Sequence, residues 1–126
     1  MGWSRTADAQ VTIARVLPGL AIAAVRNYCE QHVPPHALHQ VRVEMVTTRG
    51  AVTIVERRAP WREDYGPEWT SHGVARLRYT ATSGIWTLYW KDRNARWHRY
   101  DLIDSTSDIH VLLDEVDRDP TGIFWG

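Results

Sequence analysis

Hydrophobic and polar residues are spaced as in a helix near the start of the chain and alternate as in strands after Pro34 and Pro35. Between residues 20 and 31, apolar side chains recur at every fourth position, which predicts a helix that the two prolines end. Beyond the prolines, apolar and polar residues alternate, a spacing typical of strands with one buried face. The alternation predicts strands at residues 40–48, 51–58, 74–80, 85–91 and 96–103.

Most connections between these predicted strands have hairpin length and contain Gly, Asn or Asp, so consecutive strands are expected to pair as an antiparallel meander. The segment 59–73 is the exception, because loops longer than about 12–15 residues are usually functional or mobile. Two tryptophans in this segment, Trp61 and Trp69, either fold over the sheet as a lid or plug the end of the core.

The clearest helical pattern lies near the C-terminal end. Ser105 and Asp108 resemble a capping box at its start, and the apolar segment 123–125 is expected to fold back after it. The apolar positions follow helical spacing and are Ile109, Leu112, Leu113 and Val116. The sequence therefore predicts an α+β fold, in which an N-terminal helix and this C-terminal amphipathic helix cover one face of a five-stranded antiparallel sheet.

Length and composition indicate a single domain. The chain has 126 residues, of which 44% are hydrophobic and 24% charged, an ordinary globular balance. We expect residues 1–19 to form an N-terminal arm and residues 20–126 the domain. The single cysteine, Cys29, excludes an internal disulfide and fits a reducing compartment. No signal peptide and no apolar run of about 20 residues is evident, so we expect a cytoplasmic protein without a membrane partner.

Charge is unevenly distributed, although the formal net charge is zero. Residues 51–100 carry nine basic and five acidic side chains, whereas residues 101–126 carry one and seven. Asp117 and Asp119 lie at the negative end of the predicted C-terminal helix, so we expect an arginine from the basic middle of the chain beside them. Arginine makes up 14 of the 15 basic residues, and a GC-rich genome would produce the same bias without any function.

Alternation also places arginine and aromatic residues on the sheet face away from the core. Arginine binds phosphate bidentately and stacks on rings, so such a face resembles the platforms that hold single-stranded nucleic acid or nucleotides. A solvated polar face with cross-strand pairs such as Glu56–Arg76 is the alternative. The candidate ligand-binding residues are Arg76, Arg78, Tyr89, Arg99 and Trp97, with Glu56 from the second strand and Trp61 from the long loop.

Other chemistry finds less support in the sequence. Cys29, His32, His36 and His39 are metal-ligating types, but the two prolines break their register and the spacing matches no regular site, so we predict no metal. Residues 117–122 begin like a calcium loop that lacks its final glutamate. No nucleophile motif or glycine-rich phosphate loop is present, and no cofactor is predicted.

Four runs of the sequence resemble a small bacterial family, the domain of unknown function numbered three thousand and twenty-four. They are VTIVERRAPWRED, PEWT, VARLRYTATSGIWTLYWKDRNARWHRYDL and DRDPTGIFWG, and the resemblance covers residues 38–126. Ala59 departs from the family pattern, which has a second proline there. The resemblance implies kinship and no particular activity.

Three functions are compatible with these patterns. The first is a binding module whose arginine and aromatic face holds nucleic acid or a nucleotide. The second is a protein-interaction or structural subunit that acts as a homodimer. The third is a small enzyme that uses Glu56 and His98 on a phosphate-bearing substrate, which a deep pocket holding Glu56 and Arg76 together would favour and a shallow face would disfavour.

Overall fold

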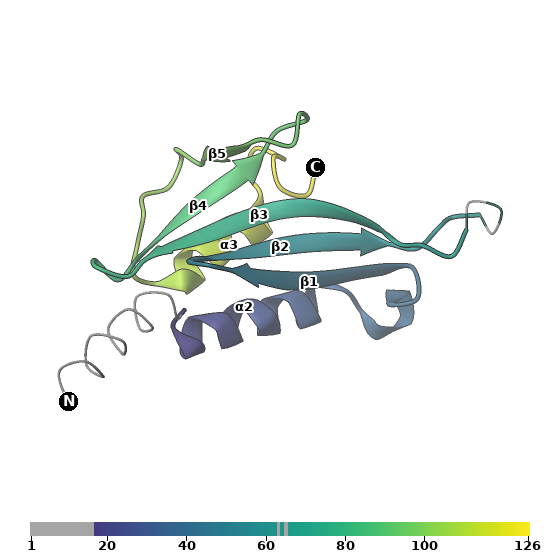
Figure 1. The fold of residues 1–126 in the computed structure, drawn as a ribbon, viewed down its shortest axis with the longest axis horizontal. Helices are drawn as coiled ribbons and strands as arrows, with labels where there is room; N and C mark the ends of the chain where they lie inside the picture. Colours follow the sequence, from purple (N-terminus) through teal and green to yellow (C-terminus); the bar gives the residue numbers. More distant parts are fainter. Residues whose placement is uncertain (1–16, 63, 65) are drawn as a thin grey trace, which may run out of the picture.

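A five-stranded antiparallel sheet, in the order β1-β2-β3-β4-β5, forms the centre of the molecule in a computed structural model (Figure 1). The structure describes residues 17–62, 64 and 66–126. The predicted α+β meander is confirmed, because every strand pairs with its neighbour in sequence. The strands are β1 (Val41–Thr48), β2 (Ala51–Arg58), β3 (Thr70–Thr80), β4 (Ile85–Lys91) and β5 (Trp97–Arg99), and the helices are α2 (Gly19–His32), the 3-10 turn η1 (Pro35–Ala37) and α3 (Ile109–Arg118).

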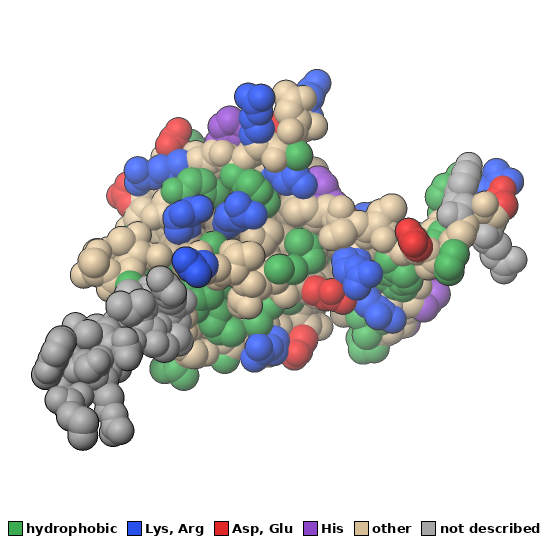
Figure 2. Space-filling view, viewed as in Figure 1, with side chains coloured by type: hydrophobic (Ala, Val, Ile, Leu, Met, Phe, Trp, Pro, Cys, Tyr) green, Lys and Arg blue, Asp and Glu red, His purple; other side chains and the backbone are tan. Residues whose placement is uncertain are grey.

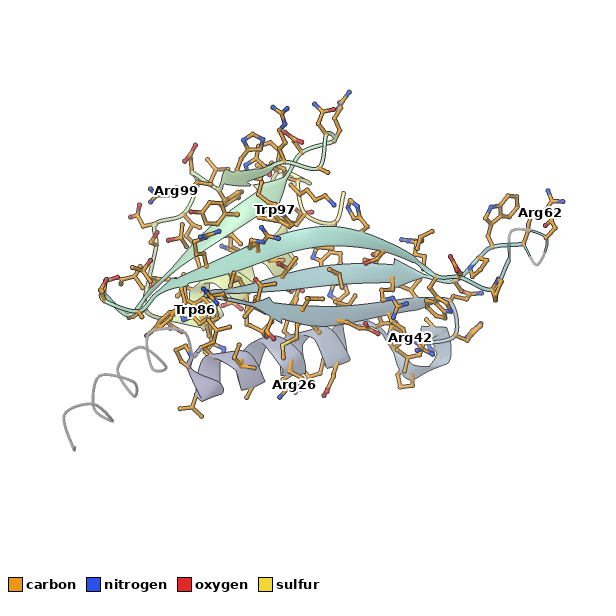
Figure 3. All side chains as sticks on the ribbon, viewed as in Figure 1. Arg26, Arg42, Arg62, Trp86, Trp97 and Arg99 are labelled. Carbon is orange, nitrogen blue, oxygen red and sulfur yellow. The ribbon has the colours of Figure 1, made fainter. Side chains whose placement is uncertain are left out.

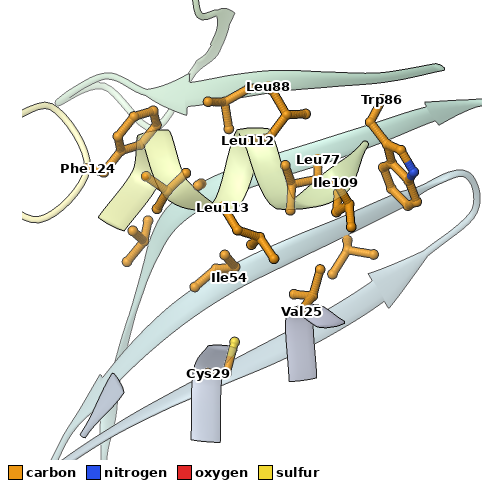
Figure 4. Close-up of a cluster of buried hydrophobic side chains, with 14 of the residues drawn as sticks. Val25, Cys29, Ile54, Leu77, Trp86, Leu88, Ile109, Leu112, Leu113 and Phe124 are labelled. Atoms are coloured by element: carbon orange, nitrogen blue, oxygen red, sulfur yellow. The ribbon is translucent and has the colours of Figure 1, made fainter. Parts of the chain in front are cut away.

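The core lies between the sheet and the two helices, which cover the same sheet face (Figure 4). Leu77, Trp86 and Leu88 project from the sheet, and Val25 from α2 and Leu112 from α3 meet them; all five are at most 2% exposed. Burial of each such apolar side chain stabilises the fold by roughly 1.5–3 kcal/mol. The helical and alternating patterns in the sequence thus converge on one core.

Strand β3 begins four residues before the predicted start at residue 74. Its pairing with β2 shifts between Ile54 and Val55, whose partners are Ala75 and Gly73, so Val74 is an extra residue in a β-bulge. Val74 and Ala75 are both buried. The bulge therefore returns Gly73 to the open face and lets the strand continue back to Thr70.

Strand β5 is shorter than predicted and ends at Arg99, well before residue 103. The Tyr100 amide still donates to the Leu88 carbonyl, but the chain then leaves the sheet. Pairing resumes only where Thr106 forms an isolated bridge with Trp86. Hydrogen bonding along the outer edge of β4 is thus divided between two separate segments.

Helix α3 begins after Asp108, whose carboxylate accepts a 3.0 Å hydrogen bond from the His110 amide. The expectation that Ser105 caps this helix is wrong. Its hydroxyl lies 2.8 Å from the Thr87 hydroxyl, because the bridge at Thr106 holds this stretch against β4.

The C-terminal segment folds back, as the sequence predicts. Phe124 is 4% exposed, and Trp125 stacks on His32 with ring centroids 4.0 Å apart. The predicted arginine partner of the two helix-end aspartates is wrong: Asp117 accepts a 3.3 Å hydrogen bond from the Tyr28 hydroxyl, and Asp119 accepts from backbone amides. Backbone donors and a phenol thus replace the expected cation.

The connection between β2 and β3 projects beyond the end of the sheet (Figure 1). Trp61 in this projection is 79% exposed, so it neither plugs the core nor covers the sheet. Trp69, at the base, lies under the Arg42 guanidinium at 4.7 Å.

Within the described ranges, no helix is long and apolar enough to cross a bilayer.

Candidate functional site

The sheet face opposite the helices presents a row of polar and aromatic side chains. Thr53, Arg76, Tyr89 and Arg99 lie directly opposite one another on strands β2 to β5. Cross-strand partners point to the same side of a sheet, so these residues share the open face. Figure 2 views this face, on which blue and green side chains gather over β3 and β4.

Arg76 is held in place at the centre of this row. Its Nε donates a 3.0 Å hydrogen bond to the buried Thr53 hydroxyl, and its guanidinium lies over the Trp97 ring at 4.4 Å. Burial, followed by the nearby charge of Arg78, lowers the pKa of Arg76. Arginine nevertheless remains charged in proteins, so the site contains a fixed cation in partly desolvated surroundings.

Three further cations lie on the β3 to β5 part of the same face. The guanidinium of Arg78 is 5.8 Å from the Tyr89 ring centroid, and Arg99 donates a long, 3.5 Å hydrogen bond to the Ser105 hydroxyl. Lys91 lies opposite Trp97 on β5. None of these four cations forms an ion pair with a described carboxylate, whereas Arg57, which alternation from Thr53 places on the same face, is paired with Glu44 at 3.5 Å. The positive charge of these four side chains is therefore not compensated by an ion pair within the described residues.

Glu56 does not join this group. It lies three positions along β2 from Thr53, and alternation therefore directs it to the opposite face. Its carboxylate accepts a 2.7 Å charged hydrogen bond from Arg58. The suggested Glu56–Arg76 pair is absent, because Thr53 is the residue opposite Arg76.

The open-face cluster consists of Arg76, Arg78, Tyr89, Lys91, Trp97 and Arg99. Trp61 is also separate from this cluster. Its sequence neighbour Arg62 lies at the tip of the β2–β3 projection, at the far end of the molecule from Trp97 and Arg99 (Figure 3). Five of the seven candidate residues are therefore brought together, and Glu56 and Trp61 are not.

His98 lies on the helix-side face, where its ring is 4.8 Å from that of Trp90. Its Nε2 is 2.6 Å from Asp92, which also accepts the amides of Asn94 and Arg96 in the β4–β5 turn. The hydrogen bond from His98 is the main reason that the pKa of Asp92 is lowered. Three interstrand spacings, about 14 Å, separate the strands of His98 and Glu56, so the structure does not assemble the enzymatic arrangement.

Two clefts lie away from the open-face cluster. One of about 920 Å³ is found at the base of the projection, between Gln40, Arg58 and Glu68. Another of about 500 Å³ lies between α2 and β1, beside Arg26 and Met45. Neither cleft is lined by a cation of the open-face cluster, so a ligand of that cluster would lie across the sheet surface.

The part of the chain that the structure describes contains no group of three metal-ligating side chains. Cys29 is 3% exposed, and burial raises the pKa of its thiol to about 12. A thiol that is protonated at neutral pH is a poor metal ligand.

The family described as the domain of unknown function DUF3024 matches residues 17–126. The chain belongs to this family. The match includes α2 and therefore begins well before residue 38, where the sequence resemblance starts. No curated protein and no solved structure matches the chain. Membership in DUF3024 fixes the kinship of this domain, while its chemistry rests on the geometry of its surfaces.

Two residues of the open face in this DUF3024 domain escaped the sequence analysis. Thr53 fixes Arg76 through its hydroxyl, and no sequence signal distinguishes it from other strand threonines. Gly73 lies against Trp97 and Lys91. A glycine beside a strand pattern is a recognised signal of a bulge or of a close approach, so Gly73 was detectable in principle.

Proposed function

We propose that this DUF3024 domain binds nucleic acid or a nucleotide through the open face of its sheet. One observation carries the proposal: four cations on the β3 to β5 part of this face lack ion pairs with described carboxylates and lie among aromatic rings. The residues concerned are Arg76, Arg78, Lys91 and Arg99, with Tyr89 and Trp97.

Electrostatics and ring chemistry support this class of ligand. Like charges held close together repel, and a phosphate group compensates them through charge-assisted hydrogen bonds with arginine. Tyr89 and Trp97 add ring surface on which bases stack. A ligand that combines phosphate groups with planar bases matches both features of the face.

A second candidate function, protein docking, rests on the outer edge of β1. This eight-residue strand ends the sheet, and the cleft of about 500 Å³ lies between it and α2. Edge strands carry unpaired backbone groups to which an extended segment of another protein can add. Val46 on this strand is 47% exposed.

The test compares binding by the wild-type domain and by the double variant Arg78→Ala/Arg99→Ala. Arg76 is kept, because its removal would leave the buried Thr53 hydroxyl without this hydrogen bond. Fluorescence anisotropy with labelled oligonucleotides and nucleotides should show binding at least about tenfold weaker for the variant, a loss of about 1.4 kcal/mol.

The control is Arg26→Glu, which changes the net charge by the same two units on α2, far from Trp97 (Figure 3). It should bind as the wild type does. Equal affinity of the folded double variant and the wild type would exclude the open face. Absence of all nucleotide binding, together with a dimer that Val46→Lys dissociates, would favour the docking function.

A further inference from the structure

Gly73 makes space for an aromatic ring on the open face. A Cβ at this position would lie 3.0 Å from Trp97 Cζ2, 3.2 Å from Trp97 Cη2 and 3.3 Å from Lys91 Cδ. These separations are shorter than ordinary van der Waals contacts. The glycine is thus explained by the close approach of Trp97 to β3, and no left-handed backbone conformation requires it.

Trp97 and Arg76 form one cation–aromatic unit, and Tyr89 and Arg78 form a second. The guanidinium-to-ring distances are 4.4 Å in the first unit and 5.8 Å in the second. Both arginines come from β3, two positions apart on the same face, which separates their backbones by about 6.5 Å. This repeat suits successive nucleotides of an extended strand better than a lone nucleotide, which would engage one unit.

The shape of the face argues against a duplex as the ligand. The cluster spans β3 to β5, a width of about 10 Å. Exposed carboxylates, Asp101 and Asp104, follow Arg99 in the chain just beyond β5. Reading of duplex DNA requires an element that enters a groove, such as a helix or a two-stranded ribbon, whereas these side chains lie across the face of three paired strands. Exposed bases of a single strand, in contrast, stack on aromatic rings and on arginine planes.

We infer that the open face binds single-stranded nucleic acid across at least two nucleotides, with Gly73 as the residue that positions Trp97 for stacking. This inference rests on the proposed function and adds the form of the ligand. The phosphates lie along Arg76 and Arg78, and the bases stack on the two cation–aromatic units. RNA and DNA share this chemistry.

The experiment compares Gly73→Ala with the matched control Gly19→Ala, where a new Cβ meets nothing within 4 Å. The probes are ten-nucleotide oligo(U) and oligo(dT), a mononucleotide, a ten-base-pair duplex and inorganic polyphosphate, which provides charge without bases. A comparison of the affinities for oligo(U) and oligo(dT) shows whether the 2′-hydroxyl contributes to binding.

For the wild type, the single strands should bind at least about tenfold more tightly than the mononucleotide and the duplex, and should quench tryptophan fluorescence. Gly73→Ala should weaken binding to the single strands by about tenfold, because stacking contributes on this scale per base. It should change the affinity for polyphosphate by no more than about twofold. Gly19→Ala should change neither the affinity for single strands nor that for polyphosphate.

Two patterns of results overturn the inference in different ways. If the duplex and polyphosphate bind as tightly as the single strands and Gly73→Ala changes nothing, the inference fails while the proposed phosphate-binding face stands. If no phosphate-bearing probe binds, both fail. Should Gly73→Ala unfold the domain, Trp97→Leu replaces it, because this variant removes the ring and retains the cations; unchanged single-strand affinity of Trp97→Leu would overturn the inference.

Discussion

Asp119 binds the end of the chain through backbone amides. Its carboxylate accepts hydrogen bonds from the amides of Phe124, at 3.0 Å, Trp125, at 2.8 Å, and Gly126, at 3.3 Å. The residue itself has φ of 43°, in the left-handed region that favours glycine and tolerates aspartate and asparagine. One side chain therefore both ends α3 and fixes the segment that buries Phe124.

Asp119→Ala should lower the free energy of unfolding by about 1–3 kcal/mol, because three amides lose their acceptor and alanine is strained at positive φ. Asp119→Asn should lower it by less, since asparagine tolerates this φ and retains one acceptor oxygen. Urea denaturation measures both changes. Equal stability of Asp119→Ala and the wild type would show that the carboxylate does not hold the C-terminal segment.

At the residue scale, the candidate site was predictable where alternation along a strand decides which face of the sheet a side chain occupies. Arg76 and Arg78 occupy polar positions between buried residues, so period-two alternation assigns them to the open face. Glu56 has the same parity as the buried Ile54, so the same rule directs it to the helix-side face, and its assignment to the open face was wrong. Trp61 lies in a connection, where no periodicity constrains the direction of a side chain.

The β4–β5 hairpin is stabilised by a single carboxylate. Asp92 accepts amide hydrogen bonds from Asn94 at 2.8 Å and Arg96 at 3.0 Å, and pairs with His98 at 2.6 Å. The hairpin positions Trp97 for its contact with Arg76, so the turn influences the shape of the open face.

Acid should destabilise this hairpin through Asp92. Because its pKa in the folded state is lowered, chiefly by His98, the ionised carboxylate favours folding. The contribution is present above the ordinary aspartate pKa of about 3.9 and is lost as the pH falls through the lower folded value. Chemical denaturation between about pH 5 and pH 2 should therefore show a smaller loss of stability for Asp92→Asn than for the wild type. Parallel pH profiles for the two proteins would contradict this role.

The boundaries of strands were predictable where local sequence signals mark both ends of the strand. Strands β2 and β4 have the predicted bounds, because alternation fills them and short turns flank them. The start of β3 was missed because a glycine usually interrupts a strand, whereas the bulge at Val74 carries the strand past it. The end of β5 was missed because alternation reports the burial of side chains, and Tyr100 is buried although the strand ends at Arg99.

For the whole molecule, zero net charge coexists with a local cationic surface. Binding that depends on such a surface should respond to salt according to the number of phosphates it contacts, independently of the total charge. Exposed Asp101 and Asp104, which follow Arg99, place negative charge next to this surface.

The salt dependence of single-strand binding should therefore be moderate. Four phosphate contacts predict a slope of about −2.8 in a plot of log K against log salt concentration, and removal of two contacts in Arg78→Ala/Arg99→Ala should reduce it to about −1.4. Anisotropy titrations at four or more salt concentrations measure both slopes, with Arg26→Glu as the control of unchanged slope. A slope near zero for the wild type would exclude phosphate contacts, and equal slopes for the wild type and the double variant would place them elsewhere.

The neighbour-to-neighbour strand order has a consequence for synthesis of the protein. Each strand pairs with the one made just before it, so the sheet can grow one hairpin at a time as the chain leaves the ribosome. Contact between the helices must wait, because the hydrogen bond from Tyr28 to Asp117 spans 89 positions. A nascent chain that stalls before α3 exposes the apolar face of a completed sheet, the stage at which this domain is most prone to aggregate.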